Sequence, residues 1–355
     1  MKKPFPVIGV MSGTSLDGLD MAFCLFSKKN GRWQYRIGSA ETAHYSPEWK
    51  QRLKGVGEMK AVDLAFADTE YGHLIGTLVR NFIRRHKIEP VLIASHGHTV
   101  FHRPRQGMTL QIGHGAAIAA ETGIETVCDF RTTDVAMGGQ GAPLVPVGDR
   151  DLFGQFTFCL NLGGFANVSY DHRGKRIAFD ICPVNVVLNM LAATKGMEFD
   201  RGGALAAAGN LYVPLLQALD RLPFYSAPPP KSLGKEWVMS EVMPVLGSFR
   251  IPVKDKLHTF GHHIAGQIAA ACSGKRKGTI LVTGGGAYNH FLVDLVRMMT
   301  PHEVIIPDDL TISFKEALIF AFLGMLRVTG QLNTLRSVTG ARSDTIGGAV
   351  YAGTG

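Results

Sequence analysis

The stretch that decides the fold is Val7–Phe26, which reads VIGVMSGTSLDGLDMAFCLF. Two apolar runs, Val7–Val10 and Met21–Phe26, enclose a turn rich in glycine, serine and threonine. This order predicts a β-hairpin whose tip is Ser12–Gly18. Glycine lets backbone N–H groups converge on phosphate oxygens without a clashing Cβ, and the hydroxyl groups add neutral donors. The tip is therefore a candidate phosphate-binding loop, although one glycine turn alone is weak evidence.

Two further glycine turns follow apolar strands. The predicted strand Phe156–Leu162 enters Gly163–Gly164, and the predicted strand Thr279–Thr283 enters Gly284–Gly286. No P-loop is present, because the spacing G-x-x-x-x-G-K-[ST] does not occur, and the last turn lacks the G-x-G-x-x-G spacing of dinucleotide-binding proteins. Three such turns at wide spacing predict a nucleotide cleft that is gripped from two sides.

The chain length of 355 residues predicts two lobes, because single hydrophobic cores rarely grow beyond about 250–300 residues. Each half opens with a glycine-tipped hairpin and continues with strands and helices, which indicates a two-lobed α/β protein. We expect an N-terminal lobe over 1–140 and a C-terminal lobe over 141–355, and leave open that the C-terminal helix returns to the first lobe. The glycine-rich stretch Met137–Pro143 is interpreted as a hinge or loop between them. The predicted helices are Val62–His86, Gly115–Thr122, Asn185–Thr194, His258–Cys272, Asn289–Met299 and Phe314–Arg327.

Composition narrows the class of protein. The net charge is +8, but the basic residues are scattered and no basic motif is interleaved with aromatics, which disfavours nucleic-acid binding. No apolar run reaches the roughly 20 residues that a membrane span needs. The five cysteines are odd in number and dispersed, which indicates free thiols in a reducing compartment, and we expect a cytoplasmic protein. They are Cys24, Cys128, Cys159, Cys182 and Cys272.

Polar side chains follow several predicted strands, and their pattern leaves two roles open for each. Asp180 closes a short strand and precedes a helix, so it suits either a catalytic base or a helix cap. Asp17 could hold Mg²⁺ through a water molecule, or it could stabilise the turn by accepting hydrogen bonds from backbone N–H groups. Arg131 and Asp134 follow a buried strand, and they suit either binding of a carboxylate and a polar group or an ion pair that holds the loop.

Eight stretches of the chain form a longer pattern, and they read MSGTSLDGLD, SHGHT, TVCDFRTTDVAMGGQGAPLVP, NLGGFANV, FDICPVN, PPKSLG, GGGAYN and SVTGA. In this order they resemble the anhydro-N-acetylmuramic acid kinases, and the matches run from Gly9 to about Gly348. The segments Met11–Asp20 and Asp129–Pro146 are the longest and most specific of these. The resemblance implies the actin/hexokinase/Hsp70-like (ribonuclease H-like) fold, with an ATP cleft between the lobes.

The resemblance also implies an activity. Members of the family open the 1,6-anhydro ring of their sugar with water and phosphorylate O6 with ATP, giving N-acetylmuramic acid 6-phosphate in peptidoglycan recycling. Such a kinase uses ATP and Mg²⁺, acts on a small amino sugar without nucleic acid or membrane, and is expected to form a homodimer. Water that attacks an anomeric carbon must lose a proton, so a carboxylate base is needed there.

Roles for individual residues follow from the resemblance. Asp180 matches the catalytic base, and His98, Arg131 and Asp134 are expected to bind the sugar, with Arg131 facing its lactyl carboxylate. The residues expected to bind ATP are Gly13, Thr14, Ser15, Leu16, Asp17, Gly18, Leu19, Asp20, Gly163, Gly164, Gly284, Gly285, Gly286 and Asn289. The histidines at 96, 98, 102 and 114 match no strong zinc signature, so we interpret the first two as lining the sugar side or bonding to backbone.

The sequence departs from the family pattern beside the expected base. Where the family reads D-T-G-P-x-N, this chain has Ile181 and Cys182 after Asp180, and His98 and Leu233 replace a glutamine and a threonine in two other motifs. These changes lie near expected sugar contacts, so two alternatives stay open. One is a relative that acts on another (anhydro) sugar, and the other is a nucleotide-binding ATPase or switch module without sugar kinase activity. A glycoside hydrolase is disfavoured, because no clear second carboxylate partners the base.

Overall fold

The chain folds into two compact units. The computed structural model describes residues 3–13, 16–274 and 276–354. Unit 1 comprises Met1–Leu152 and Phe314–Gly355, and unit 2 comprises Phe153–Ser313. The expected boundary after residue 140 differs from this one, because the first segment of unit 1 runs on to Leu152. The return of the C-terminal helix to the first lobe, which the sequence left open, is found here.

Unit 1 is built on a sheet with the strand order β13-β7-β4-β1-β2-β3. The hairpin of β1 (Phe5–Ser12) and β2 (Gly18–Lys29) is antiparallel, as the sequence predicts, and β3 (Arg32–His44) extends it. Strand β4 (Leu92–Ser95) runs parallel to β1, and β7 (Thr126–Cys128) runs parallel to β4. The carboxyl ends of β1, β4 and β7 therefore meet at one edge of the sheet, which is where ligands usually bind in open α/β sheets.

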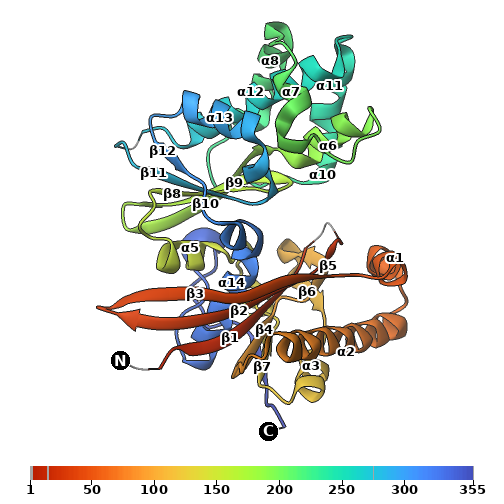
Figure 1. Ribbon diagram of the computed structural model, residues 1–355, viewed down its shortest axis with the longest axis vertical. Coiled ribbons are helices and arrows are strands. Elements are labelled where there is room, and N and C mark those ends of the chain that lie inside the picture. Colours follow the sequence, from red (N-terminus) through yellow and green to blue (C-terminus); the bar gives the residue numbers. More distant parts are fainter. Residues whose placement is uncertain (1–2, 14–15, 275, 355) are drawn as a thin grey trace. The chain divides into compact units, whose positions relative to one another are not determined.

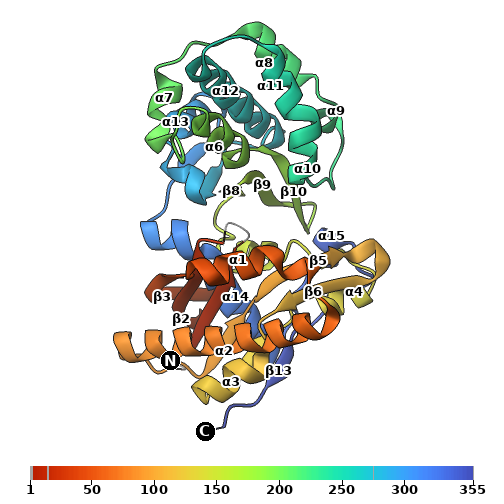
Figure 2. The same ribbon diagram turned by 90° about the vertical axis from the view of Figure 1, so that its right-hand side faces the viewer.

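Alternation along β1 explains how this sheet is covered. Ile8 and Val10 face the core formed with α2 (Ala61–His86) and α3 (Gly115–Thr122), while the intervening Gly9 faces α14 (Asp309–Val328) on the opposite side. The helix lies so close that a Cβ at Gly9 would stand only 1.8 Å from the carbonyl oxygen of Ala317. Figures 1 and 2 show these helices on either face of the unit 1 sheet.

Replacing Gly9 by alanine is expected to destabilise the protein by about 2–3 kcal/mol, because the added methyl group meets backbone atoms that have no room to move. The measurement is the free energy of unfolding from urea denaturation. Gly55→Ala serves as the matched control in the same unit, because a Cβ at Gly55 would have no other atom within 4 Å. Equal stabilities of the two variants would contradict the close approach of α14 to β1.

Unit 2 repeats the same topology. Its sheet has the order β10-β9-β8-β11-β12, in which β8 (Phe158–Leu162), β9 (Phe165–His172) and β10 (Lys175–Pro183) form an antiparallel meander. Strand β11 (Thr279–Thr283) runs parallel to β8, and β12 (Glu303–Ile305) runs parallel to β11. Both units therefore carry the strand order third-second-first-fourth-fifth with the second strand antiparallel. This is the ribonuclease H-like arrangement that the sequence led us to expect.

Helices complete the two units. In unit 2, α12 (Val253–Ala271) and α13 (His290–Met299) pack against the sheet in one continuous core. The other helices are α1 (Pro47–Gly55), α4 (Thr132–Ala136), α5 (Pro146–Leu152), α6 (Asn185–Ala193), α7 (Ala204–Ala207), α8 (Val213–Asp220), α9 (Pro223–Ser226), α10 (Lys235–Trp237), α11 (Met243–Ser248) and α15 (Arg336–Thr339).

Strands β5 (His98–Arg103) and β6 (Met108–Ile112) form a separate hairpin, and β13 (Ala349–Tyr351) pairs with β7. Within the described ranges, none of the helices has the length and apolar character needed to cross a bilayer.

Candidate active site

The tip of the first hairpin presents backbone and one carboxylate. Leu16 has a positive φ of 58° and donates its N–H to the Gly13 carbonyl at 3.3 Å, so the chain turns sharply here. Asp17 is exposed, while Leu19 is completely buried in the core and offers a ligand no exposed surface in this structure. The expected contacts at Thr14 and Ser15 lie outside the described residues.

Asp20 begins the return strand and has an acidic neighbour that sequence analysis missed. Its carboxylate accepts a 2.6 Å hydrogen bond from Thr42 Oγ1, and burial raises the pKa of Asp20 against that bond. Glu316 on α14 retains an exposed surface, yet the protein packed around it raises its pKa, and the charge of Asp20 adds to the rise. The signal was available in the sequence, because Lys315-Glu316 interrupts an otherwise apolar helix.

Arg131 and His96 form the central pair of the unit 1 site. His96 places Nδ1 2.9 Å from the Gly97 carbonyl, which can only accept, so Nδ1 carries the proton and Nε2 accepts from Arg131. Arg131 donates Nε and Nη2 to this Nε2 at 3.1 and 2.9 Å, and Nη1 to the Gly141 carbonyl at 3.0 Å. Burial and the nearby guanidinium lower the pKa of His96 to about 3, so the imidazole is neutral.

The guanidinium of Arg131 is held by neutral hydrogen-bond partners, and the charge of Glu316 acts on it only from beyond ion-pair distance. No carboxylate of the described residues lies within ion-pair distance of it, and burial lowers its pKa to about 10. The turn before it is held by Asp129, whose φ is +55° and whose Oδ1 accepts from Thr132 Oγ1 at 2.6 Å. A fixed cationic fork with neutral partners is well suited to an anionic ligand.

His98 lies beside this pair in a buried network of neutral groups. Its Nδ1 is 3.4 Å from Ser12 Oγ at the end of β1, and Tyr45 donates its hydroxyl to the same Ser12 Oγ at 2.9 Å. The Tyr45 and Tyr71 hydroxyls lie 2.6 Å apart. Burial lowers the pKa of His98, so this side chain offers a neutral donor and acceptor rather than a charge.

The structure corrects the expectation that Asp134 contacts substrate. Asp134 is completely buried, its Oδ2 accepts from the Gly141 N–H at 2.8 Å, and its Oδ1 accepts from Thr339 Oγ1 at 2.8 Å. A Cβ at Gly139 would stand 2.2 Å from Oδ2, which explains a glycine there. The glycine-rich loop therefore wraps a structural carboxylate inside unit 1, and it is not a hinge at the boundary of the units.

Asp180 in unit 2 is held by two backbone groups of the loop that carries Lys231 and Leu233. Its N–H donates to the Lys231 carbonyl at 3.0 Å, and its Oδ2 accepts from the Leu233 N–H at 2.9 Å. Burial raises the pKa of Asp180, and the bond from Leu233 opposes the rise. The next helix, α6, begins only at Asn185 with Val184 as its N-cap, so Asp180 does not cap it. The cap interpretation is therefore excluded, and the role of Asp180 as a base stays a prediction.

The glycine turns of unit 2 combine close packing with exposed backbone. Gly284 has a φ of +81°, and a Cβ there would stand 2.4 Å from Asn161 Oδ1, so glycine is required by the fold as well. Gly285 is exposed, and a Cβ there would meet no atom closer than 3.8 Å. The predicted helix includes Asn289, whereas in the structure Asn289 is the N-cap of α13 and accepts from the Leu292 N–H at 3.0 Å.

The turn between β8 and β9 is closed by the residues that follow β10. Gly164 accepts from the Val184 N–H at 2.8 Å, and Gly163 accepts from the Asn185 N–H at 3.3 Å. The two carbonyls therefore point toward the start of α6. This contact joins the second glycine turn to the segment that carries Asp180.

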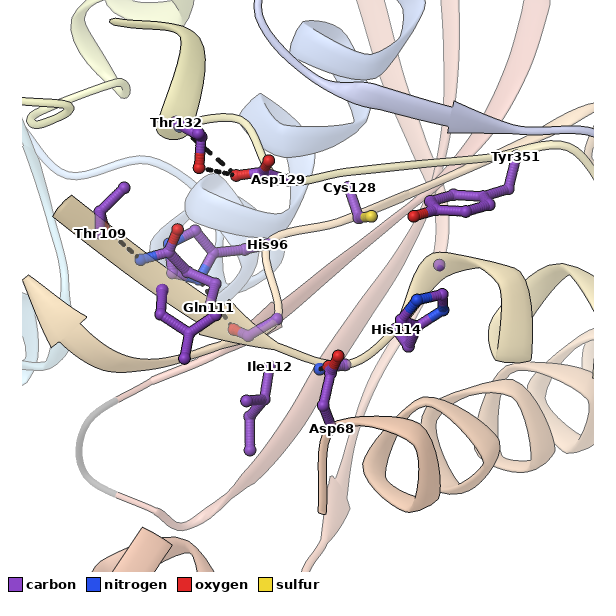
Figure 3. A pocket seen from close by; sticks show the side chains of 14 residues that line it. Asp68, His96, Thr109, Gln111, Ile112, His114, Cys128, Asp129, Thr132 and Tyr351 are labelled. Atoms are coloured by element: carbon purple, nitrogen blue, oxygen red, sulfur yellow. Dashed lines mark hydrogen bonds between the residues drawn. The ribbon is translucent and has the colours of Figure 1, made fainter. Parts of the chain in front are cut away.

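A pocket of about 150 Å³ opens in unit 1 between the β5–β6 hairpin and the ends of β4 and β7. Figure 3 shows His96 and Gln111 on one side of it and His114 and Tyr351 on the other. Asp129 also lines it, so the pocket adjoins the turn that carries Arg131. The sequence pattern does not predict this pocket, because it does not predict the β5–β6 hairpin that covers it.

Comparison with known proteins decides the family. Residues 6–353 match the family model described as anhydro-N-acetylmuramic acid kinase. The chain belongs to this family. Proteins with that name from Xanthomonas oryzae pv. oryzae, Sulfurovum sp. and Pseudomonas putida are 35%, 34% and 34% identical to it, over 97% of this chain in each case and 96%, 98% and 98% of theirs.

Membership of the anhydro-N-acetylmuramic acid kinase family covers both units, since the matched residues include nearly all of each. The alternative of a nucleotide switch without kinase activity is not favoured by these relatives. A solved structure of (R)-2-hydroxyglutaryl-CoA dehydratase component A from Acidaminococcus fermentans aligns at 12% identity and a TM-score of 0.47, over 92% of this chain and 99% of that chain. At that level it adds nothing to the fold assignment, which stands on the sheet order.

Proposed function

We propose that this protein is an ATP-dependent kinase that opens the anhydro ring of 1,6-anhydro-N-acetylmuramic acid with water and phosphorylates O6. Family membership supports the reaction, and the geometry of Asp180 supports its first step. Asp180 lies on β10 at the edge of the unit 2 sheet, where its carboxylate accepts from the Leu233 N–H and its own N–H donates to the Lys231 carbonyl. It does not cap the helix that follows. That fixed carboxylate is the observation that carries the proposal.

The reaction balances with one base and one phosphoryl donor. Asp180 accepts a proton from water as the water oxygen bonds to C1, the C1–O6 bond breaks, and O6 bonds to the γ-phosphorus of ATP with release of ADP. Burial raises the pKa of Asp180 toward the working pH, which makes the carboxylate a stronger proton acceptor. Positioning and charge stabilisation supply most of the catalysis in phosphoryl transfer.

The glycine turns are proposed to hold ATP. Backbone N–H groups of the tip at 13–18, apart from that of Leu16, and those at 163–164 and 284–286 are the donors we assign to the phosphates and the nucleoside. The exposed backbone of Gly285 favours this assignment. Asp17 and Asp20 offer carboxylate oxygens of the kind that Mg²⁺ prefers, so they are the residues we assign to it. Mg²⁺ would supply charge neutralisation between phosphate oxygens.

The sugar is proposed to lie against Arg131 and His98. The lactyl group of the anhydro sugar carries a carboxylate, and Arg131 offers a cationic fork without an acidic partner among the described residues. His98 is neutral and suits a sugar hydroxyl or amide. We propose a cytoplasmic location, because ATP is the donor and the five cysteines are free thiols, and a homodimer on the family resemblance.

Isotope transfer tests the proposal. The protein is incubated with Mg-ATP and 1,6-anhydro-N-acetylmuramic acid in ¹⁸O water, and the products are weighed by mass spectrometry. We expect a ring-opened sugar phosphate with ¹⁸O in the sugar and none in inorganic phosphate. If ¹⁸O appears in inorganic phosphate without any sugar phosphate, the protein is an ATPase and the proposal is wrong. A reaction without sugar is the control for background ATP hydrolysis.

A further inference from the structure

The loop that contacts Asp180 has few backbone donors with which to stabilise its own conformation. It runs over 227–234, between α9 and α10, and is largely exposed. Three consecutive prolines, at 228–230, have no backbone N–H to donate, so this part of the loop forms no ladder with a neighbouring strand. Its conformation therefore depends on anchors elsewhere.

Two contacts join the end of the loop to the proposed base. The carbonyl of Lys231 accepts the Asp180 N–H, and the Leu233 N–H donates to Asp180 Oδ2. They lie at a bulge in β10, where the register with β9 shifts between Asp180 and Cys182. A bulge leaves backbone groups of the strand without partners in the β-ladder. The loop supplies a partner for one of these groups, because the Lys231 carbonyl accepts the Asp180 N–H. Any movement of residues 231–233 would thus move the carboxylate.

The side chain of Lys231 folds back to anchor this loop. Its Nζ donates to the Phe224 carbonyl at 3.0 Å, lies 3.5 Å from the Tyr225 carbonyl, and stands 4.5 Å from the centre of the Phe224 ring. The ammonium therefore ties the end of the loop to α9, the helix that precedes the loop, through charge-assisted hydrogen bonds and a cation–π contact. An ammonium committed in this way does not extend toward a phosphate.

The anchor itself is rigid. The Tyr225 ring packs edge-on against His263 with centroids 4.7 Å apart, and His263 Nδ1 lies 2.6 Å from Asp220 Oδ1. His263 is fully buried on α12, and Cys182 is fully buried on β10. The carbonyls that receive Lys231 are thus fixed to the core of unit 2.

We propose that Lys231 is a positioning residue for the ring-opening step: its ammonium holds the loop so that the Leu233 N–H and the Lys231 carbonyl clamp Asp180. The inference rests on the proposed role of Asp180 as the base. In this proposal Lys231 touches no reacting atom, and it acts on Asp180 through the backbone of residues 231–233.

Cys182 and Lys231 are titratable side chains near Asp180 in unit 2, and neither is a cause of the shift in the pKa of Asp180. The charges of Asp180 and Lys231 both act on the pKa of Cys182, whereas the pKa of Asp180 itself is raised by burial and lowered by the Leu233 bond. Asn167, opposite Asp180 on β9, carries no charge. Loosening the loop removes the bond that favours the carboxylate, so the pKa of Asp180 rises and activity is lost at a higher pH on the acid side.

The test is the pH profile of Lys231→Met, which keeps an unbranched chain one atom shorter than lysine and removes its donors. We expect kcat to fall about tenfold even on the high-pH plateau, where Asp180 is ionised in both proteins, because the carboxylate is misplaced. We also expect the acid limb of kcat/KM to move to higher pH, with little change in the KM for ATP. Lys231→Arg should restore most of the rate, since guanidinium donates to carbonyls and stacks on aromatic rings.

Lys235→Met is the matched control, because Lys235 is exposed and lies four positions along the same segment. Phe224→Leu is a second test if Lys231→Met does not fold, and it should lower kcat in the same direction by removing the ring under the ammonium. An unchanged plateau kcat in folded Lys231→Met overturns the proposal, and so does a raised KM for ATP at constant kcat, which would mean a phosphate contact. Failure of the wild-type protein to convert the anhydro sugar contradicts the proposed function instead.

Discussion

Replacing Asp180 by asparagine is expected to lower kcat for the coupled ring opening and phosphorylation by about 10²–10⁴-fold, the usual contribution of a positioned general base. The amide cannot take the proton from the attacking water, but it has nearly the same shape and still accepts the Leu233 N–H through its oxygen. Binding of ATP should therefore change little. Steady-state kinetics with the anhydro sugar and calorimetric titration with ATP measure the two effects separately.

Asp294→Asn is the matched control for this variant, because Asp294 is an exposed carboxylate of unit 2 that pairs with Arg297 in the next turn of α13. It should retain the wild-type rate. The pH profile adds an independent check. Burial raises the pKa of Asp180, so wild-type kcat/KM should decline on the acid side above the ordinary range of an aspartate. A rate for Asp180→Asn within a few-fold of wild type would remove Asp180 from the mechanism.

Local pattern was enough to predict the elements that carry the fold. The first hairpin, the helix at 61–86 and the strands before each glycine turn combine strong apolar periodicity with clear turn residues. The hairpin Met108–Ile112 with His98–Arg103 was missed, because its strands are short, half-exposed and joined by a turn containing Pro104 and Gly107. The first segment of unit 1 ends at Leu152 rather than at 140, and the return of 314–355 to unit 1 could only be left open. Both depend on packing between distant segments, such as Gly9 on α14.

The site was predictable where a residue type is tied to its chemistry, and less so where its environment decides. Arg131 and Asp134 were assigned together, since both follow one strand and both suit a polar ligand. The structure separates them: Asp134 is completely buried with both oxygens bonded to loop groups, whereas Arg131 has only neutral partners. Glu316 lies near both Asp20 and Arg131 only after α14 has folded onto the sheet. No local pattern carries that information.

Removing the guanidinium of Arg131 is expected to reduce kcat/KM for the anhydro sugar by roughly 10²-fold, mainly through KM. This corresponds to about 3 kcal/mol, within the range for a charge-assisted pair that excludes water. Arg131→Ala tests the full loss, and Arg131→Lys tests the need for a planar fork, since lysine keeps the charge only. Arg84→Ala, an exposed arginine of unit 1, is the control for general effects of lost charge.

A change of substrate distinguishes carboxylate binding from a structural role of Arg131. 1,6-Anhydro-N-acetylglucosamine has the same anhydro ring and acetamido group but no lactyl carboxylate. If Arg131 binds that carboxylate, wild type and Arg131→Ala should handle this analogue with similar, low kcat/KM, while they differ about 10²-fold on the muramic substrate. If Arg131 only holds His96 and the Gly141 carbonyl in place, its loss should lower kcat/KM for both sugars by the same factor. Equal losses would therefore leave the lactyl carboxylate without its assigned partner.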